Sequence, residues 1–160
     1  MTEVSVRAVT PAEFDVWQAE LAAGYAQEHV SAGNWPADEA LDRARQAIAV
    51  QLPDGMATPG ELLLIGVLPD GSPVGRIWIS LTHPRGLAHC AYLQDIELVA
   101  ERRGQGLGRA LLAAGERAAR ERGAHALELN VFGANETARN LYESSGYRVV
   151  TQQMRKNLLT

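Results

Sequence analysis

One short stretch limits what this chain can fold into more than any other. The apolar segment 96–99 is followed by a turn with glycines at Gly104, Gly106 and Gly108, and then by an amphipathic helical pattern that begins at Leu107. A strand that runs through such a turn into a helix exposes backbone N–H groups where the helix dipole also favours negative charge. The stretch therefore predicts a binding site for a phosphorylated ligand.

Two common phosphate-binding motifs do not match this turn. A dinucleotide fingerprint needs Gly-x-Gly-x-x-Gly, but counting from Gly104 the third glycine position is Arg109. In addition, no acidic residue follows about 20 residues later in a clear ribose-binding context. An ATP-type loop needs Gly-Lys-Ser/Thr, whereas residues 106–109 read Gly-Leu-Gly-Arg. The pattern left to explain is Arg103-x-x-Gly106-x-Gly108.

The totals restrict the class of protein. A chain of 160 residues suits one domain, 1–160, with a substantial core. The net charge of −4 argues against a nucleic-acid-binding protein, and no apolar run approaches the roughly 18 residues that span a membrane. The N-terminus lacks the basic and apolar regions of a signal peptide, and the single cysteine, Cys90, cannot form an internal disulfide. We therefore expect a soluble, cytoplasmic protein.

Hydrophobic periodicity predicts the element order β-α-α-β-β-β-α-β-α-β. Strands are expected at 3–9, 61–68, 74–82, 91–99, 126–132 and 147–154. Helices are expected after Thr10, after Pro36, from residue 107 to the stop at Gly123, and from the N-cap Asn135 through Ser145.

The loop 83–90 contains two histidines and the only cysteine of the chain. A metal site would need further ligands at defined spacing, and a cysteine nucleophile would need a histidine placed beside it. We expect solvent-facing histidines, a small apolar cysteine and no metal.

A second motif lies near the C-terminus. Residues 135–147 match Asn-x-x-Ala-x-x-Leu-Tyr-x-x-x-Gly-Phe/Tyr at every defined position. Asn135 and Tyr142 are seven residues apart, so a helix places them on one side, two turns from each other. Ala138 and Leu141 are expected to face the core.

The two motifs and the element order resemble the GCN5-related N-acetyltransferase (GNAT) superfamily, whose pyrophosphate loop is Gln/Arg-x-x-Gly-x-Gly/Ala. The resemblance covers the whole chain. It implies an α/β (α+β) acyl-CoA N-acyltransferase fold, with a mixed central sheet of six or seven strands flanked by about four helices. It also implies acetyl-CoA as the acetyl donor, without a metal. Because relatives are often dimers, it allows a homodimer.

The resemblance also assigns roles to residues. Tyr142 would supply a proton to the CoA sulfur, and backbone N–H groups at the end of the strand 91–99 would bind the thioester oxygen. The first two helices border the acceptor site in this family, so Trp17, Tyr25 and Trp35 are candidate acceptor contacts, although core packing is the favoured role of the aromatic side chains on the first helix. The expected cofactor contacts are Leu98, Val99, Arg103, Gly104, Gln105, Gly106, Leu107, Gly108, Arg109 and Asn135.

The base is the least defined role. Asp95 and Glu97 lie on one face of the strand by its two-residue period. We favour Glu97 as the base because it is nearer the expected thioester, and Asp95 as a substrate contact. Asp95 acting as the base, Glu97 binding the cationic substrate or facing solvent, and proton removal by water alone remain open alternatives.

The sequence thus predicts an N-acetyltransferase in which a primary amine attacks the thioester of acetyl-CoA directly. A CoA-binding sensor module with little turnover and a protein or peptide acetyltransferase are the alternatives. No motif identifies the acceptor, which can be an amine-bearing small molecule or a peptide. We expect no nucleic acid or membrane partner.

Overall fold

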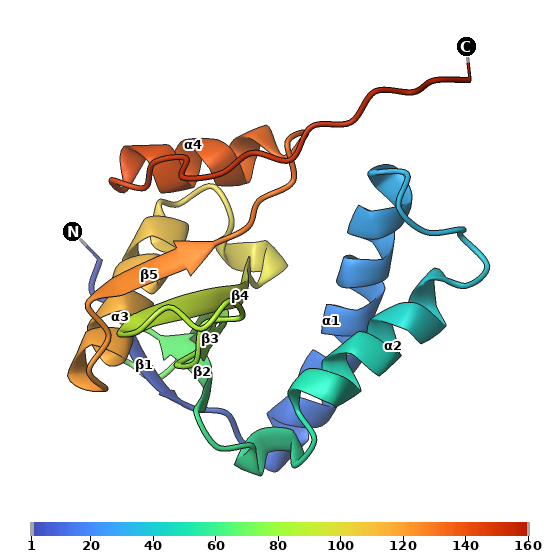
Figure 1. The fold of residues 1–160 in the computed structure, drawn as a ribbon. Helices are drawn as coiled ribbons and strands as arrows, with labels where there is room; N and C mark the ends of the chain where they lie inside the picture. Colours follow the sequence, from blue (N-terminus) through green and yellow to red (C-terminus); the bar gives the residue numbers. More distant parts are fainter. Residues whose placement is uncertain (1, 160) are drawn as a thin grey trace.

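The computed structural model describes residues 2–159 and consists of one five-stranded sheet between two helical layers (Figure 1). The strands are β1 (Ser5–Ala8), β2 (Glu61–Val67), β3 (Pro73–Ser80), β4 (Cys90–Leu98) and β5 (Ala126–Leu129). The helices are α1 (Pro11–Ser31), α2 (Ala40–Gln51), α3 (Leu107–Glu121) and α4 (Glu136–Ser144), with short 3-10 turns at Gly55–Ala57 and Ala100–Arg102. The strands are ordered β1-β2-β3-β4-β5, and only β4 and β5 are parallel.

Alternation along the central strands creates two hydrophobic cores. Leu63, Ile65 and Trp78 pack against α1 and α2 on one face of the sheet. Ile77 and Ile79 belong to the second core, with α3 on the opposite face, and both are fully buried. Successive strand residues point to opposite faces, which explains this division.

Local sequence signals fix the helix starts. Thr10 caps α1 by accepting a hydrogen bond from the Glu13 N–H at 3.3 Å, and the Glu13 carboxylate accepts from the Thr10 N–H at 3.0 Å. Asn135 caps α4 by accepting from the Ala138 N–H at 3.1 Å. The reciprocal bonds of Thr10 and Glu13 form a capping box at the start of the helix that is expected after Thr10, and the predicted N-cap Asn135 is confirmed.

A bulge in β4 and an early end of β5 open the sheet on one side. Trp78 pairs with Asp95 and Ile79 with Leu93, so Gln94 is an extra residue in β4. The strands β4 and β5 pair only from Cys90 to Leu93. Beyond this point β4 continues for residues 94–98 without a neighbour on its β5 side.

The prediction of six or seven strands is wrong, because the described chain has five. Residues 147–154 are predicted to be the last strand but form none, and β5 ends at Leu129 rather than at residue 132. Strand propensity produces a strand only where another strand offers its hydrogen-bonding edge, and residues 147–154 have no such neighbour in the described structure. Between residues 2 and 159 no helix is long and apolar enough to cross a membrane.

Candidate active site

The glycine-rich turn adopts the conformation that its sequence predicts. Gly104 and Gly106 have φ values of 74° and 76°, a region that glycine enters without steric cost. Gly106 is the N-cap of α3 and forms no side-chain cap, and the first turn of α3 carries no acidic residue. The first N–H groups of α3 are therefore available to an anion. Leu107 is buried, so only its backbone can take part.

Three arginines surround this turn, each with a partner of its own. Arg103 Nη2 lies 2.6 Å from Glu97 Oε1, and both side chains are about half exposed (59% and 46%). Arg109 donates to the hydroxyls of Ser144 and Ser145 at 2.7 and 3.1 Å, and Arg102 donates to Ser72 at 3.2 Å. Arg109 thus keeps its whole charge, because hydroxyls do not neutralise it. The Gln105 amide donates to the Glu101 carbonyl at 3.0 Å.

The backbone N–H groups of Leu98 and Val99, both expected at the thioester, point to opposite sides of β4. The Val99 N–H donates to the Val74 carbonyl at 2.9 Å and is therefore used within the sheet. In an antiparallel ladder, alternate residues direct their N–H groups toward opposite neighbours. The Leu98 N–H consequently points to the open β5 side of β4, where a ligand can reach it.

A glycine permits the close approach of β3 to this part of β4. A Cβ on Gly75 would overlap the Glu97 carbonyl oxygen and lie 2.9 Å from the Leu98 Cα. Both neighbours are backbone atoms, so β4 would have to move to accommodate any other residue.

Tyr142 lies on α4, half-buried, with its ring 5.8 Å from that of Tyr147. Burial, and then the negative charges of Asp95 and Glu28, raise the pKa of Tyr142 to about 12. The phenol is therefore protonated at neutral pH and can act as a hydrogen-bond donor. Tyr142 on α4 therefore lies within electrostatic range of the carboxyl groups of Asp95 on β4 and Glu28 on α1.

Asp95 and Glu97, which sequence periodicity places on one face, have different environments. The Asp95 carboxylate is paired with Arg76 at 2.8 Å, and Arg76 also binds Glu20 of α1 at 2.7 Å. Burial nevertheless raises the pKa of Asp95 above its usual range. Glu97 is exposed and faces Arg103.

Glu28 on α1 is a third carboxylate of this region, and the sequence reading missed it. Glu28 is exposed, but partial desolvation by the surrounding protein, followed by the charges of Asp95 and Glu97, raises its pKa above the usual value. It forms no ion pair within residues 2–159. A signal was present: Glu28 continues the stripe Phe14, Trp17, Leu21 and Tyr25 at helical spacing, where a charge is unexpected.

Aromatic side chains form a cluster at the C-terminal end of α1. The ring of His29 stacks on Trp35 at 3.9 Å and meets the edges of Tyr25 at 4.5 Å and Phe132 at 5.3 Å. Trp35 and Tyr25, two of the predicted acceptor contacts, are thus brought together. Trp17, the third, is buried in the core between α1 and the sheet.

The tautomer of His29 follows from its neighbours. The Asn34 Oδ1 accepts a hydrogen bond from Arg155 at 2.6 Å, so its amide nitrogen donates to His29 Nδ1 at 2.9 Å. The neutral ring then carries its proton on Nε2. This N–H is buried and has no hydrogen-bond partner in the described part of the chain.

The expectation of solvent-facing histidines in the loop 83–90 is wrong for His83, which is buried, while His89 is exposed. His83, Cys90 and Glu128 have their potential ligand atoms within 4.8 Å of one another. However, His83 Nδ1 accepts the Arg85 N–H at 3.0 Å, so the neutral ring carries its proton on Nε2, 3.1 Å from Glu128. Nε2 therefore has no free lone pair for a metal in this arrangement. Burial of His83 is explained by its contacts with this loop and with β5.

Comparison with known proteins is consistent with this geometry. The family model "Acetyltransferase (GNAT) family" matches residues 24–147. YycN of Bacillus subtilis (strain 168), named an uncharacterized N-acetyltransferase, is 37% identical over 134 residues, or 84% of this chain and 85% of that protein. YdgE of the same organism, named likewise, is 30% identical over 152 residues, or 94% and 95% of the two chains.

Solved structures extend the comparison to the fold. The crystal structure of YycN has a TM-score of 0.90 at 33% identity, covering 98% of this chain and 99% of that chain. The aminoglycoside N-acetyltransferase AAC(6')-Iy in complex with CoA has a TM-score of 0.61 at 15% identity, covering 100% and 97% of the two chains, and shares the fold alone. The matching family model and the two relatives show that this chain belongs to the GNAT acetyltransferase family.

Proposed function

We propose that the protein transfers the acetyl group of acetyl-CoA to a primary amine by direct attack on the thioester. The observation that carries this proposal is the stretch of β4 beyond Leu93 that has no partner on its β5 side, followed by the uncapped start of α3 with Arg103 in the turn and Arg109 in the first turn of the helix. The N–H groups of α3 and the two guanidinium groups suit a pyrophosphate. Leu98, the last residue of β4, lies on this unpaired stretch just before the turn, and the thioester would lie there.

The reaction is one nucleophilic substitution at the acetyl carbonyl carbon. The amine nitrogen bonds to this carbon, the carbonyl oxygen gains negative charge near the Leu98 N–H, and the carbon–sulfur bond then breaks. The amine loses one proton and the sulfur gains one. No covalent enzyme intermediate is needed.

Tyr142 is the proposed donor to the departing sulfur. Its pKa of about 12 keeps the hydroxyl protonated at any pH where the protein would work. Because a thiol has a pKa of about 8.5, the phenol first stabilises the departing thiolate as a hydrogen-bond donor. The phenol then supplies, as general acid, the proton that the sulfur gains, and the proton lost by the amine restores the phenol. This role requires the hydroxyl group, which a phenylalanine at the same position lacks.

Glu97 is the proposed base, and Glu28 a proposed acceptor contact. Arg103 pairs with Glu97 in the described structure, and a doubly charged pyrophosphate would be a stronger partner for Arg103. Binding of the donor would thus release the carboxylate. Glu28 and Asp95 add negative charge that attracts an ammonium group, which supports a cationic acceptor.

Thiol release from acetyl-CoA, measured against a panel of small amines and peptides, tests the proposal. Tyr142→Phe should lower kcat by about 100-fold without changing acetyl-CoA affinity. Tyr147→Phe is the matched control: it removes a neighbouring hydroxyl, which donates to Glu116 at 3.0 Å, and should leave kcat unchanged.

Two outcomes would contradict the proposal. An unchanged kcat in Tyr142→Phe would remove Tyr142 from the chemistry. Tight acetyl-CoA binding without turnover on any amine would instead favour the CoA-binding sensor module.

A further inference from the structure

The bulge in β4 places two consecutive polar side chains on one face of the sheet. Asp95 lies opposite Trp78, which packs against α1 and α2. The Gln94 side chain reaches Ser80, which is two residues after Trp78 on β3 and therefore lies on the same face. In a regular strand, two neighbouring side chains would point to opposite faces. Gln94 and Asp95 share the face that α1 covers because Gln94 is the extra residue of the bulge.

A series of side-chain hydrogen bonds connects this bulge to β2. The Gln94 amide donates to the Ser80 hydroxyl at 3.1 Å, and Ser80 donates to Glu61 Oε2 at 2.6 Å. The Trp78 indole N–H donates to the same carboxylate oxygen at 2.7 Å. Ser80 and Trp78 are only 4% and 3% exposed, so water hardly competes for these bonds. The four side chains form one network across β2, β3 and β4, which we call the bulge network.

Glu61 is the residue that makes this network specific. It forms no ion pair within residues 2–159, although it is a half-buried carboxylate. Partial burial of a carboxylate costs free energy unless hydrogen bonds compensate for the lost water. Glu61 obtains two such bonds on one oxygen, and both require β3 to be in its observed register. A satisfied polar network of this kind fixes one arrangement of the strands.

The register of β4 after the bulge decides which backbone groups face the proposed thioester. The Val99 N–H donates to the Val74 carbonyl at 2.9 Å, so the Leu98 N–H points to the open side of β4. A shift of one residue exchanges the two faces of a strand and the directions of its N–H groups. Without the extra residue, the Leu98 N–H would therefore be used within the sheet. The Asp95 side chain would also leave the face on which it pairs with Arg76.

We propose that Glu61, Ser80 and Gln94 are positioning residues, which hold the bulge and thereby direct the Leu98 N–H toward the thioester oxygen. They act through the backbone of β4. A hydrogen-bond donor that is fixed in advance stabilises developing charge better than one that must be ordered during the reaction. The effect on catalysis rests on the proposed acetyl transfer, whereas the effect of the network on the bulge does not.

Hydrogen exchange of single amides, followed by NMR on the full-length protein, tests the link between the network and the bulge. Ser80→Ala removes the hydroxyl that joins Gln94 to Glu61. The Val99 amide should then exchange about 10-fold faster, because its bond to β3 depends on the register after the bulge. The Leu64 amide in β2 should exchange as before. Gln94→Ala removes the same hydrogen bond at a half-buried position, which tolerates substitution better, and should give the same result.

Ser31→Ala is the matched control for exchange and for kinetics. The Ser31 hydroxyl also accepts a hydrogen bond from a glutamine amide, that of Gln27 at 3.2 Å, but at the exposed end of α1. This variant should leave the exchange of Val99 and the kcat unchanged.

Steady-state kinetics tests the effect on the reaction, at a temperature well below the Tm of each variant. Ser80→Ala and Glu61→Leu should lower kcat about 10-fold and leave KM for acetyl-CoA unchanged, because the glycine-rich turn is not altered. Glu61→Gln keeps an oxygen that accepts from Ser80 and Trp78, so it should restore most of the activity.

The two measurements separate the possible failures. Unchanged exchange of Val99 in Ser80→Ala and Gln94→Ala would overturn the inference, whatever reaction the protein catalyses. Faster exchange with an unchanged kcat would show that the network holds the bulge but does not position a reacting group, which overturns the positioning role. A wild-type protein without turnover on any amine, combined with faster exchange in the variants, would refute the proposed acetyl transfer and still confirm that the network holds the bulge.

Discussion

Substitution of Gly106 separates the backbone requirement of the turn from its role in binding. Gly106 has a φ of 76°, and a Cβ added there would meet nothing within 4 Å. Gly106→Ala therefore introduces backbone strain alone, which costs about 1–2 kcal/mol for a left-handed residue. For a chain of this length, the expected loss in Tm is roughly 2–8 °C. Gly86, with a φ of 73° and equally open surroundings, is the matched control and should lose the same amount as alanine.

Affinity for acetyl-CoA should separate the two variants. The new methyl group of Gly106→Ala would occupy the space through which a pyrophosphate approaches the start of α3, whereas Gly86 lies in the loop between β3 and β4. Calorimetric titration should show a loss of about 10-fold, or 1.4 kcal/mol, for Gly106→Ala only. If Gly106→Ala keeps its affinity, or if both variants lose it equally, the turn does not bind the pyrophosphate.

Three further predictions concern the carboxylates and the close approach of β3 to β4. In steady-state kinetics, Glu28→Gln should raise KM for the amine about 10-fold with little change in kcat, whereas Glu97→Gln should lower kcat by about 100-fold; the opposite pattern would exchange their roles. A hydrogen bond from the Arg7 guanidinium lowers the pKa of Glu13 to about 2. The ionised carboxylate therefore stabilises the fold at pH values above its usual pKa of 4.5, and this contribution is lost as the pH falls toward 2. Denaturant unfolding of Glu13→Gln should therefore show a loss of about 1 kcal/mol at pH 7 that shrinks steadily as the pH falls from 4.5 toward 2; a constant difference would contradict this. Gly75→Ala should cost about 3 kcal/mol of unfolding free energy because backbone atoms of β4 must move, whereas Gly108→Ala, with its nearest contact at 3.6 Å, should cost nothing measurable. Equal losses of unfolding free energy in the two variants would show that β3 does not approach β4 closely at Gly75.

The parts of the site that sequence predicts well depend on neighbouring residues. Gly104 and Gly106 are required by the positive φ of the turn, and Asn135 by the unsatisfied N–H groups of α4. Each requirement involves residues only a few positions apart, so spacing reveals it. The four helices and the strand β4 follow for the same reason, since amphipathic periodicity is a local property.

The parts that sequence could not predict depend on distant contacts. The partner of Asp95 is Arg76, on the neighbouring strand, and the register that joins them includes the bulge at Gln94. The burial of His83 depends on Glu128, which lies 45 residues further along the chain. Period-two reasoning places Asp95 and Glu97 on one face, but it cannot show that one is buried with a partner while the other faces Arg103.

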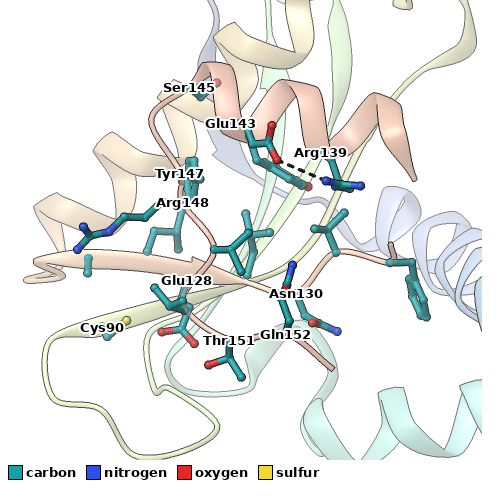
Figure 2. Close-up of a pocket in the computed structure, with 18 of the residues that line it drawn as sticks. Cys90, Glu128, Asn130, Arg139, Glu143, Ser145, Tyr147, Arg148, Thr151 and Gln152 are labelled. Carbon is teal, nitrogen blue, oxygen red and sulfur yellow. Dashed lines mark ion pairs between the residues drawn. The ribbon is translucent and has the colours of Figure 1, made fainter. Parts of the chain in front are cut away.

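The wrong strand prediction at 147–154 and the cavity beside β5 have one physical explanation. The segment contains β-branched and aromatic residues, Tyr147, Val149, Val150 and Thr151, whose preference for strands is a preference for packing on a sheet. The ends of the segment are held by hydrogen bonds to Glu116 and Asn34, and the cavity, of about 950 Å³, lies between the segment and β5 (Figure 2). In the described structure the strand-favouring residues are therefore held away from β5, the edge strand of the sheet, which ends at Leu129. Because no strand edge lies within hydrogen-bonding distance of residues 147–154 in the described structure, strand propensity alone leaves the segment without strand pairing.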